Sequence, residues 1–94
     1  MKLYNWDRGK NQILISNRGI SFEDILFAID NNKLIDDVPH PNRKKYPNQR
    51  IMILDIKNYV YAIPYVENEK EIFLKTIIPS RKATKEYLGE KNEK

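Results

Sequence analysis

Residues 79–85 (PSRKATK) combine residue types that can hold an anion. Ser80 can begin a helix as its N-cap, and Arg81 and Lys82 then fall in the first helical turn. Cations in that turn oppose the helix dipole, which favours Asp or Glu there. Arginine, lysine and the free N–H groups of a helix N-terminus can together bind a phosphate. The same two residues can instead be solvated surface charges.

A second basic group lies in the polar, proline-containing stretch 40–49. Arg43 and Lys44 suit contacts with RNA phosphates, or they form a solvated charge run. Arg50 comes next, at the start of a predicted strand, which is a more rigid platform than a loop. His40 is the chain's single histidine and can act as a base near neutral pH, or it is an exposed loop residue.

Three tyrosines and a glutamate mark one further predicted strand. Tyr59, Tyr61 and Tyr65 alternate along it and therefore share a face of the sheet. Aromatic side chains can stack on nucleic-acid bases, although strand aromatics more often pack in a core. Glu67 follows the strand and is the carboxylate best placed to act as a general base, or it is a turn residue.

The composition excludes several classes of protein. The chain has 94 residues, enough for a single domain, 1–94. It has no cysteine, so it can form neither a disulfide framework nor a thiolate metal site. No G-x-x-x-x-G-K or G-x-G-x-x-G loop occurs. The net charge of +4 favours polyanionic partners such as RNA, or it serves solubility.

The distribution of apolar residues predicts a cytoplasmic protein with no membrane contact. No apolar run approaches the roughly 18–20 residues of a membrane helix. The first seven residues also lack the apolar core of a signal peptide.

Two N-terminal helices are predicted behind a short edge strand at residues 2–4. Asp7 is a plausible N-cap for a helix over 10–17, and Gly19 suits its C-terminal end. Ser21, with Asp24 three residues later, predicts a capping box at the start of the second helix.

The rest of the chain predicts strands. Segments 34–38, 50–56, 59–65 and 71–78 are apolar and β-favouring, and a two-residue turn at Lys57-Asn58 joins the middle pair as a hairpin. A short last helix should then run to Gly89, with residues 90–94 as a frayed tail. We expect an α+β fold, with the two helices packed on an antiparallel sheet of three to four strands.

Three short motifs are distributed along nearly the whole chain, at residues 6–10, 19–23 and 77–84. Together they resemble motifs of the BrnT-type toxins. Trp6-Asp7, with Lys10 three residues on, is similar to that family's W-D-x-x-K opening. Residues 19–23, G-I-S-F-E, are similar to its G-V/I-S-F-E step into the second helix. Residues 77–84, I-I-P-S-R-K-A-T, are similar to its closing I-I-S-A-R-[RK]-A-T.

The resemblance implies a RelE-like fold and the toxin component of a toxin–antitoxin system. Such a toxin inhibits translation by cleaving RNA, and it needs no metal or other cofactor. The implied partner is a cognate antitoxin of the ribbon-helix-helix type, and operator DNA is contacted only through that antitoxin.

The implied reaction is attack of an RNA 2′-OH on the adjacent phosphate, which leaves a 2′,3′-cyclic phosphate. By this resemblance we expect Arg81 to hold the phosphate, with Arg50 and either Lys10 or Arg18 assisting. The base and the acid stay open among Glu67, Tyr65, Lys82 and His40. The expected RNA contacts are Arg18, Lys82, His40, Arg43 and Lys44.

The chain departs from the family pattern at three places. Asn17-Arg18 stand where the family usually has Lys-His, Thr76 stands where an arginine is common, and another arginine is replaced near Glu67. A catalytically inactive module of the same fold, which binds a partner or operator DNA, is therefore the first alternative. A nucleic-acid-binding domain without an antitoxin is the second.

Overall fold

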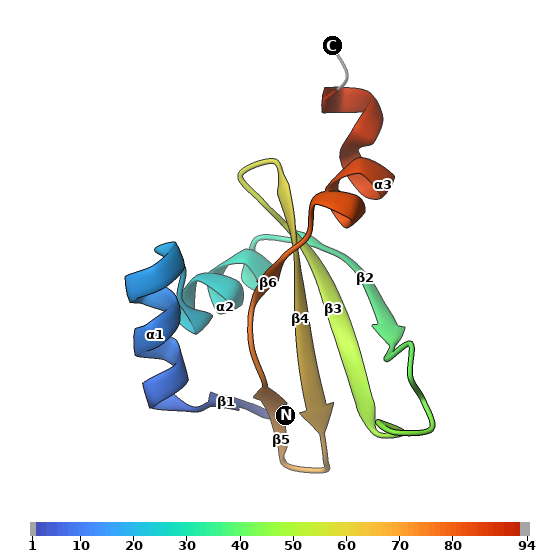
Figure 1. The fold of residues 1–94 in the computed structure, drawn as a ribbon. Coiled ribbons are helices and arrows are strands. Elements are labelled where there is room, and N and C mark those ends of the chain that lie inside the picture. Colours follow the sequence, from blue (N-terminus) through green and yellow to red (C-terminus); the bar gives the residue numbers. More distant parts are fainter. Residues whose placement is uncertain (1, 93–94) are drawn as a thin grey trace.

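The computed structural model describes residues 2–92, with the side chains of residues 2–89. This part of the chain forms a small α+β domain with three helices and a six-stranded sheet (Figure 1). The elements in chain order are β1 (Leu3–Trp6), α1 (Arg8–Arg18), α2 (Phe22–Asp30), β2 (Leu34–Pro39), β3 (Gln49–Ile56), β4 (Tyr59–Glu67), β5 (Glu71–Leu74), β6 (Ile78–Pro79) and α3 (Arg81–Asn92).

The sheet is mixed and larger than the sequence predicts. Its strand order is β1-β5-β4-β3-β2, and β6 pairs with the first part of β4. The strands from β2 to β6 pair antiparallel, as expected, but β1 runs parallel to β5. The expectation of a purely antiparallel sheet of three to four strands is therefore wrong, because β1 joins the sheet beside β5 before α1 and α2 carry the chain to β2 at the opposite edge.

Both N-terminal helices begin where the sequence predicts a cap. The Asp7 carboxylate accepts the Lys10 N–H at 2.8 Å, and Gly19 ends α1 at φ 68°, a conformation that glycine adopts at little cost. The hydroxyl of Ser21 and the carboxylate of Asp24 form both hydrogen bonds of a capping box at the start of α2. The two helix starts therefore follow from local chemistry.

A buried amide joins these helices. Asn11 of α1 accepts the Phe22 N–H at 2.8 Å and donates to the Glu23 carboxylate at 2.9 Å. The second hydrogen bond lowers the pKa of Glu23 below its ordinary value. One side chain thus satisfies the exposed start of α2 and fixes the angle between α1 and α2.

The predicted hairpin between β3 and β4 is confirmed. Lys57 and Asn58 have φ values of 55° and 66°, the two left-handed residues of a type I′ turn. Asp55 steadies the turn by accepting the Asn58 N–H at 3.0 Å. The register sets Arg50 directly opposite Tyr65 at the far end of the hairpin.

The continuous strand predicted over 71–78 is interrupted. β5 ends at Leu74, and β6 pairs with β4 in a register shifted by one residue, so the segment between them carries one extra residue, as in a β-bulge. The shift places Ile77, rather than Thr76, in the core, where it is fully buried. Burial of Ile77 therefore outweighs the regular alternation of the strand.

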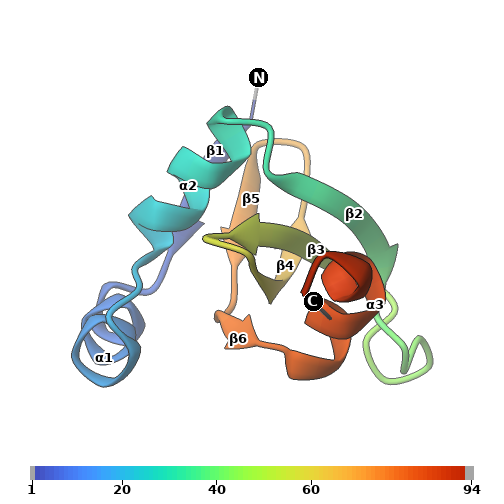
Figure 2. The ribbon, with the colours of Figure 1, turned by 90° about the horizontal axis from the view of Figure 1, so that it is seen from above.

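Two apolar clusters lie on the two faces of the sheet. Figures 1 and 2 show α2 on one side of the sheet and α3 on the other. The larger cluster packs Phe22 and Ile25 of α2 against one face, where Leu54 and Ile63 lie. The smaller one packs Leu88 of α3 against the other face. The expectation that α1 and α2 cover one face is confirmed, and α3 covers the other.

The last helix is longer than predicted. Ser80 caps α3 by accepting the Ala83 N–H at 3.0 Å, as expected, and Thr84 ties the helix to β4 by accepting the Val60 N–H at 2.9 Å. The helix then continues through Gly89 to Asn92, so the expected end at Gly89 is wrong, while the frayed tail over 90–94 stays a prediction. Residues 93 and 94 lie outside the described residues. Packing of Leu88 against the sheet outweighs the low helix propensity of glycine.

Among the described residues, no helix combines the length and the apolar character needed to cross a membrane.

Candidate functional site

A guanidinium, a phenol and a carboxylate meet at one end of the sheet. Arg50 donates through Nε to Asp37 Oδ1 at 3.1 Å and through an Nη to the Asp37 carbonyl at 2.9 Å. The hydroxyl of Tyr65 lies 2.9 and 2.7 Å from the two oxygens of the same carboxylate. Asp37 is thus shared by both predicted site residues, and we call this group the Asp37 cluster.

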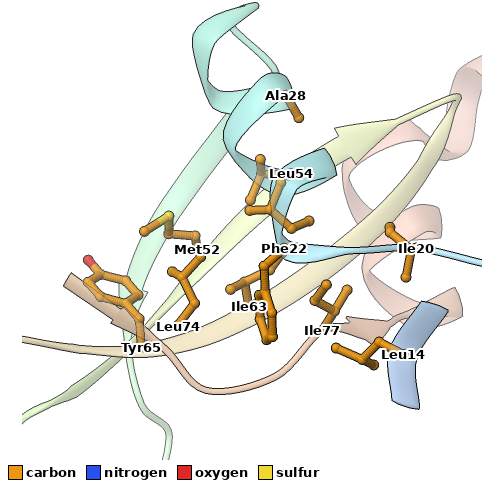
Figure 3. Packing of buried hydrophobic residues seen from close by; sticks show 11 residues of the cluster. Leu14, Ile20, Phe22, Ala28, Met52, Leu54, Ile63, Tyr65, Leu74 and Ile77 are labelled. Atoms are coloured by element: carbon orange, nitrogen blue, oxygen red, sulfur yellow. The ribbon is translucent and has the colours of Figure 1, made fainter. Parts of the chain in front are cut away.

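Strand pairing brings these residues together. Arg50 on β3 faces Tyr65 on β4, and Asp37 on β2 faces Met52, two residues along β3 from Arg50. All of them point to the face of the sheet that α1 and α2 cover, because side chains two apart on a strand share a face. In Figure 3, Tyr65 stands at one end of the core cluster, with its hydroxyl directed away from the other labelled side chains.

The Asp37 cluster combines a buried ring with accessible polar groups. The tyrosine is 3% exposed, whereas the side chains of Arg50 and Asp37 are 44% and 38% exposed. A ligand can therefore reach the guanidinium and the carboxylate without disturbing the core. This combination suits a phosphate-binding cation beside a proton acceptor and a proton donor.

The electrostatics of the cluster keep the phenol protonated. Burial, followed by the Asp37 hydrogen bond, raises the pKa of Tyr65 from 10.0 to about 12. The hydrogen bond to Asp37 also raises the pKa of the Arg50 guanidinium above its ordinary value. At neutral pH the cluster therefore holds a charged guanidinium and a neutral phenol that can donate a proton.

Alkaline titration should show Tyr65 ionising late, because its pKa is raised to about 12. Because folding raises its pKa, the folded state holds the phenolic proton more tightly than the unfolded chain. The resulting stabilisation is complete below about pH 10 and is lost as the pH rises toward 12. We expect phenolate absorbance to show a late step that Tyr65→Phe removes. Loss of an early step instead would contradict this assignment.

Glu67 lies near the cluster, but it is engaged elsewhere. Its carboxylate pairs with the ammonium of Lys2, which directly precedes β1. Because β5 lies between β4 and β1, this ion pair reaches across β5. Glu67 is two residues beyond Tyr65 on β4 and shares its face. Asp37, which was not among the residues predicted for the site, is the carboxylate in direct contact with Arg50 and Tyr65.

The cations of α3 are not brought to the Asp37 cluster. The Ser80 N–H donates to the Val60 carbonyl, so α3 begins beside Val60, five residues from Tyr65 and about 17 Å along β4. α3 also packs on the opposite face of the sheet (Figure 2). Arg81 and Lys82 are exposed in its first turn and form a separate basic site.

The cations of α1 are also separate from the cluster. Lys10 is exposed in the first turn of α1, where its backbone N–H donates to the Asp7 cap. α1 begins directly after β1, which β5 and β4 separate from β3 and β2. Arg18, at the other end, donates to the Ile77 carbonyl at 2.6 Å and lines a groove beside the β3–β4 turn. The expected grouping of Arg81 with Arg50 and Lys10 or Arg18 is therefore not present in this structure.

The loop between β2 and β3 holds the other candidates. The imidazole Nδ1 of His40 accepts the Asn42 N–H at 3.0 Å, and its ring packs against Tyr46 with centroids 4.5 Å apart. These contacts shape the loop and leave His40 partly buried rather than exposed. Arg43 and Lys44 are exposed on the same loop, and both remain accessible for ligand contacts.

One sequence signal could have indicated Asp37. Two consecutive acidic residues interrupt the apolar strand that contains Leu34 and Val38. Neighbouring strand residues point to opposite faces, so two carboxylates in a row predict one on each side of the sheet. On one face, Asp36 accepts a hydrogen bond from the Tyr87 hydroxyl of α3 at 3.0 Å. On the other face, Asp37 accepts hydrogen bonds from Arg50 and Tyr65.

Comparisons of the chain with family models, with curated proteins and with solved structures gave no match.

Proposed function

We propose that this protein is a metal-independent endoribonuclease, the toxin of a BrnT-type toxin–antitoxin system with a RelE-like fold. The observation that carries the proposal is the Asp37 cluster, where an accessible cation, a carboxylate and a protonated phenol share hydrogen bonds. These are the three kinds of group that RNA transesterification needs. The proposed role is to inhibit translation until a ribbon-helix-helix antitoxin neutralises the toxin.

The three family-like motifs support the fold part of this proposal. Each of them coincides with the start of a helix: Asp7 caps α1, Ser21 caps α2 and Ser80 caps α3. The residues at which the helices begin help to determine how the helices pack on the sheet. Motifs shared with the family at these positions therefore favour an architecture shared with it.

In the proposed reaction, Arg50 binds the non-bridging oxygens of the scissile phosphate. Asp37 takes the proton of the 2′-OH as its oxygen forms a bond to phosphorus, and Tyr65 gives its proton to the leaving 5′ oxygen. The products are a 2′,3′-cyclic phosphate and a 5′-OH. The 2.7 Å contact between Tyr65 and Asp37 then lets the proton return from the carboxyl to the phenolate.

The basic residues outside the cluster have a different proposed role. Arg81 and Lys82 on α3, with Arg43 and Lys44 on the β2–β3 loop, are exposed and contact RNA phosphates without taking part in the chemistry. Such contacts add salt-dependent affinity that is independent of sequence.

The experiment is to incubate the purified chain with mixed RNA in the presence of EDTA and to map new 3′ ends. We expect ends that carry a 2′,3′-cyclic phosphate, and none from Asp37→Asn, in which the amide cannot accept the proton. Cleavage that EDTA abolishes would contradict the proposal, as would ends bearing a 3′-OH.

One observation favours a second candidate, a non-catalytic partner-binding module. The polar groups of the Asp37 cluster already satisfy one another, as in a structural network between strands. This alternative predicts tight complex formation with a partner, no RNA ends from wild-type protein, and a loss of stability on substitution of Asp37.

A further inference from the structure

A groove of about 460 Å³ lies between α1, α2 and the β3–β4 turn, within the usual size range of ligand pockets. Its lining includes Arg18, Phe27, Lys33, Asp55, Lys57 and Tyr61. Tyr61 and Tyr65 are on the same strand and face, four residues or about 13 Å apart. The groove is therefore a separate site from the Asp37 cluster, at the other end of the helix-covered face.

The groove presents one aromatic ring that the core leaves exposed and a second that it covers only in part. Phe27 is 72% exposed, whereas Phe22, Ile25 and Ala28 of the same helix are buried. Tyr61 is only partly buried against the core. An exposed phenylalanine beside a tyrosine in a concave site offers a flat apolar surface of the kind on which an unpaired base stacks.

The charges of the groove favour an anionic ligand. Arg18, Lys33 and Lys57 contribute three cations, and Asp24 and Asp55 contribute two carboxylates. Both carboxylates accept backbone N–H groups, of Ser21 and Asn58 respectively, so local turns already engage them. Arg18 uses one N–H on the Ile77 carbonyl, which leaves its other donors for a ligand.

We propose that this groove binds single-stranded RNA, with a base against Phe27 and Tyr61 and flanking phosphates at Lys33, Lys57 and Arg18. Aromatic rings beside cations are the combination by which proteins hold unpaired bases, because every base has a stacking face and a nearby phosphate. The identification of the polymer as RNA rests on the proposed function, whereas the binding site itself does not.

The test measures binding without cleavage. A fluorescein-labelled, 2′-O-methyl octanucleotide has no free 2′-OH, so anisotropy reports affinity whether or not the protein is a ribonuclease. We expect Phe27→Ala to weaken binding about tenfold. Lys57→Asn keeps a residue that tolerates the left-handed turn, and it should reduce the magnitude of the logarithmic salt slope by about 0.7.

Matched controls separate the groove from general effects. Ile13→Ala truncates an exposed apolar residue of α1 outside the groove, and Lys85→Gln removes an exposed cation of α3. Ile13→Ala should bind as wild type does, and Lys85→Gln should leave the effect of Phe27→Ala unchanged. Arg50→Ala should leave the further loss of affinity caused by Phe27→Ala unchanged even where it removes cleavage, which distinguishes the groove from the Asp37 cluster.

Two results would overturn the proposal. One is wild-type affinity in Phe27→Ala, because the aromatic surface would then hold no base. The other is equal displacement of the octanucleotide by a polyglutamate peptide of the same charge, which would assign the groove to an acidic protein. Groove binding in a protein that leaves no cyclic-phosphate ends would instead refute the proposed function alone.

Discussion

Arg50→Ala lowers the rate of RNA cleavage by about 10²–10³-fold, the usual cost of removing one preorganised group that stabilises transition-state charge. The guanidinium is held by two hydrogen bonds to Asp37 while nearly half of its side chain stays exposed, so it is oriented before the substrate arrives. The measurement is the single-turnover rate on a defined oligonucleotide, with circular dichroism to verify folding.

Two further variants make the Arg50 result specific. Arg50→Lys keeps the charge but loses the planar fork, so we expect it to recover only part of the rate. Arg81→Ala removes the same side chain from α3 and should weaken binding while leaving the single-turnover rate at saturating protein nearly unchanged. A larger rate loss in Arg81→Ala than in Arg50→Ala would move the chemistry to α3.

Phe22→Ala lowers the free energy of unfolding by about 3–5 kcal/mol, the cost of truncating a buried phenylalanine to alanine. The ring is fully buried at the centre of the larger core cluster and stacks on Trp6, with centroids 5.6 Å apart. A chain of this length has only about 5–14 kcal/mol of stability to lose. Urea unfolding followed by Trp6 fluorescence measures the change.

The same helix supplies the control for Phe22. Phe27→Ala makes an identical chemical change in α2, but at a side chain that is 72% exposed. We expect a change within about 0.5 kcal/mol, since the substitution leaves no cavity and alanine favours the helix. Equal losses in the two variants would mean that Phe27 is buried in solution, for example against a second molecule.

Local chemistry explains why parts of the fold could be predicted. Asp7, Ser21 and Ser80 cap the helices through hydrogen bonds within three residues, and Lys57-Asn58 turn the hairpin through their own backbone angles. Such features depend on neighbours in the sequence, so they can be predicted before the fold is known.

The incorrect predictions concern features that depend on distant contacts. The bulge before Ile77 reflects burial of that side chain. The parallel pairing of β1 with β5 joins segments far apart in the sequence, and α1 and α2 connect β1 to β2 at the opposite edge of the sheet. The extension of α3 through Gly89 follows from packing of Leu88 on the sheet. None of these is encoded by spacing alone.

The residues of the candidate site show the same difference between local patterns and distant contacts. Arg50 and Tyr65 were identified from the sequence, because a strand end and an alternating tyrosine run are local patterns. Asp37 was missed, since its role depends on the pairing of β2 with β3. Arg81 fits an anion site locally, but α3 packs on the opposite face from Arg50, and no spacing in the sequence indicates that separation.

The sequence by itself determined the helix starts, the hairpin turn and the residue types available for phosphate chemistry, because these depend on neighbouring residues and intrinsic backbone preferences. Only the tertiary structure decided that Asp37 joins Arg50 and Tyr65, that Arg81 stands apart, and that Phe27 lines a cationic groove. Strand register and helix placement are set by burial of apolar surface across the whole domain, and that burial decides which polar groups meet.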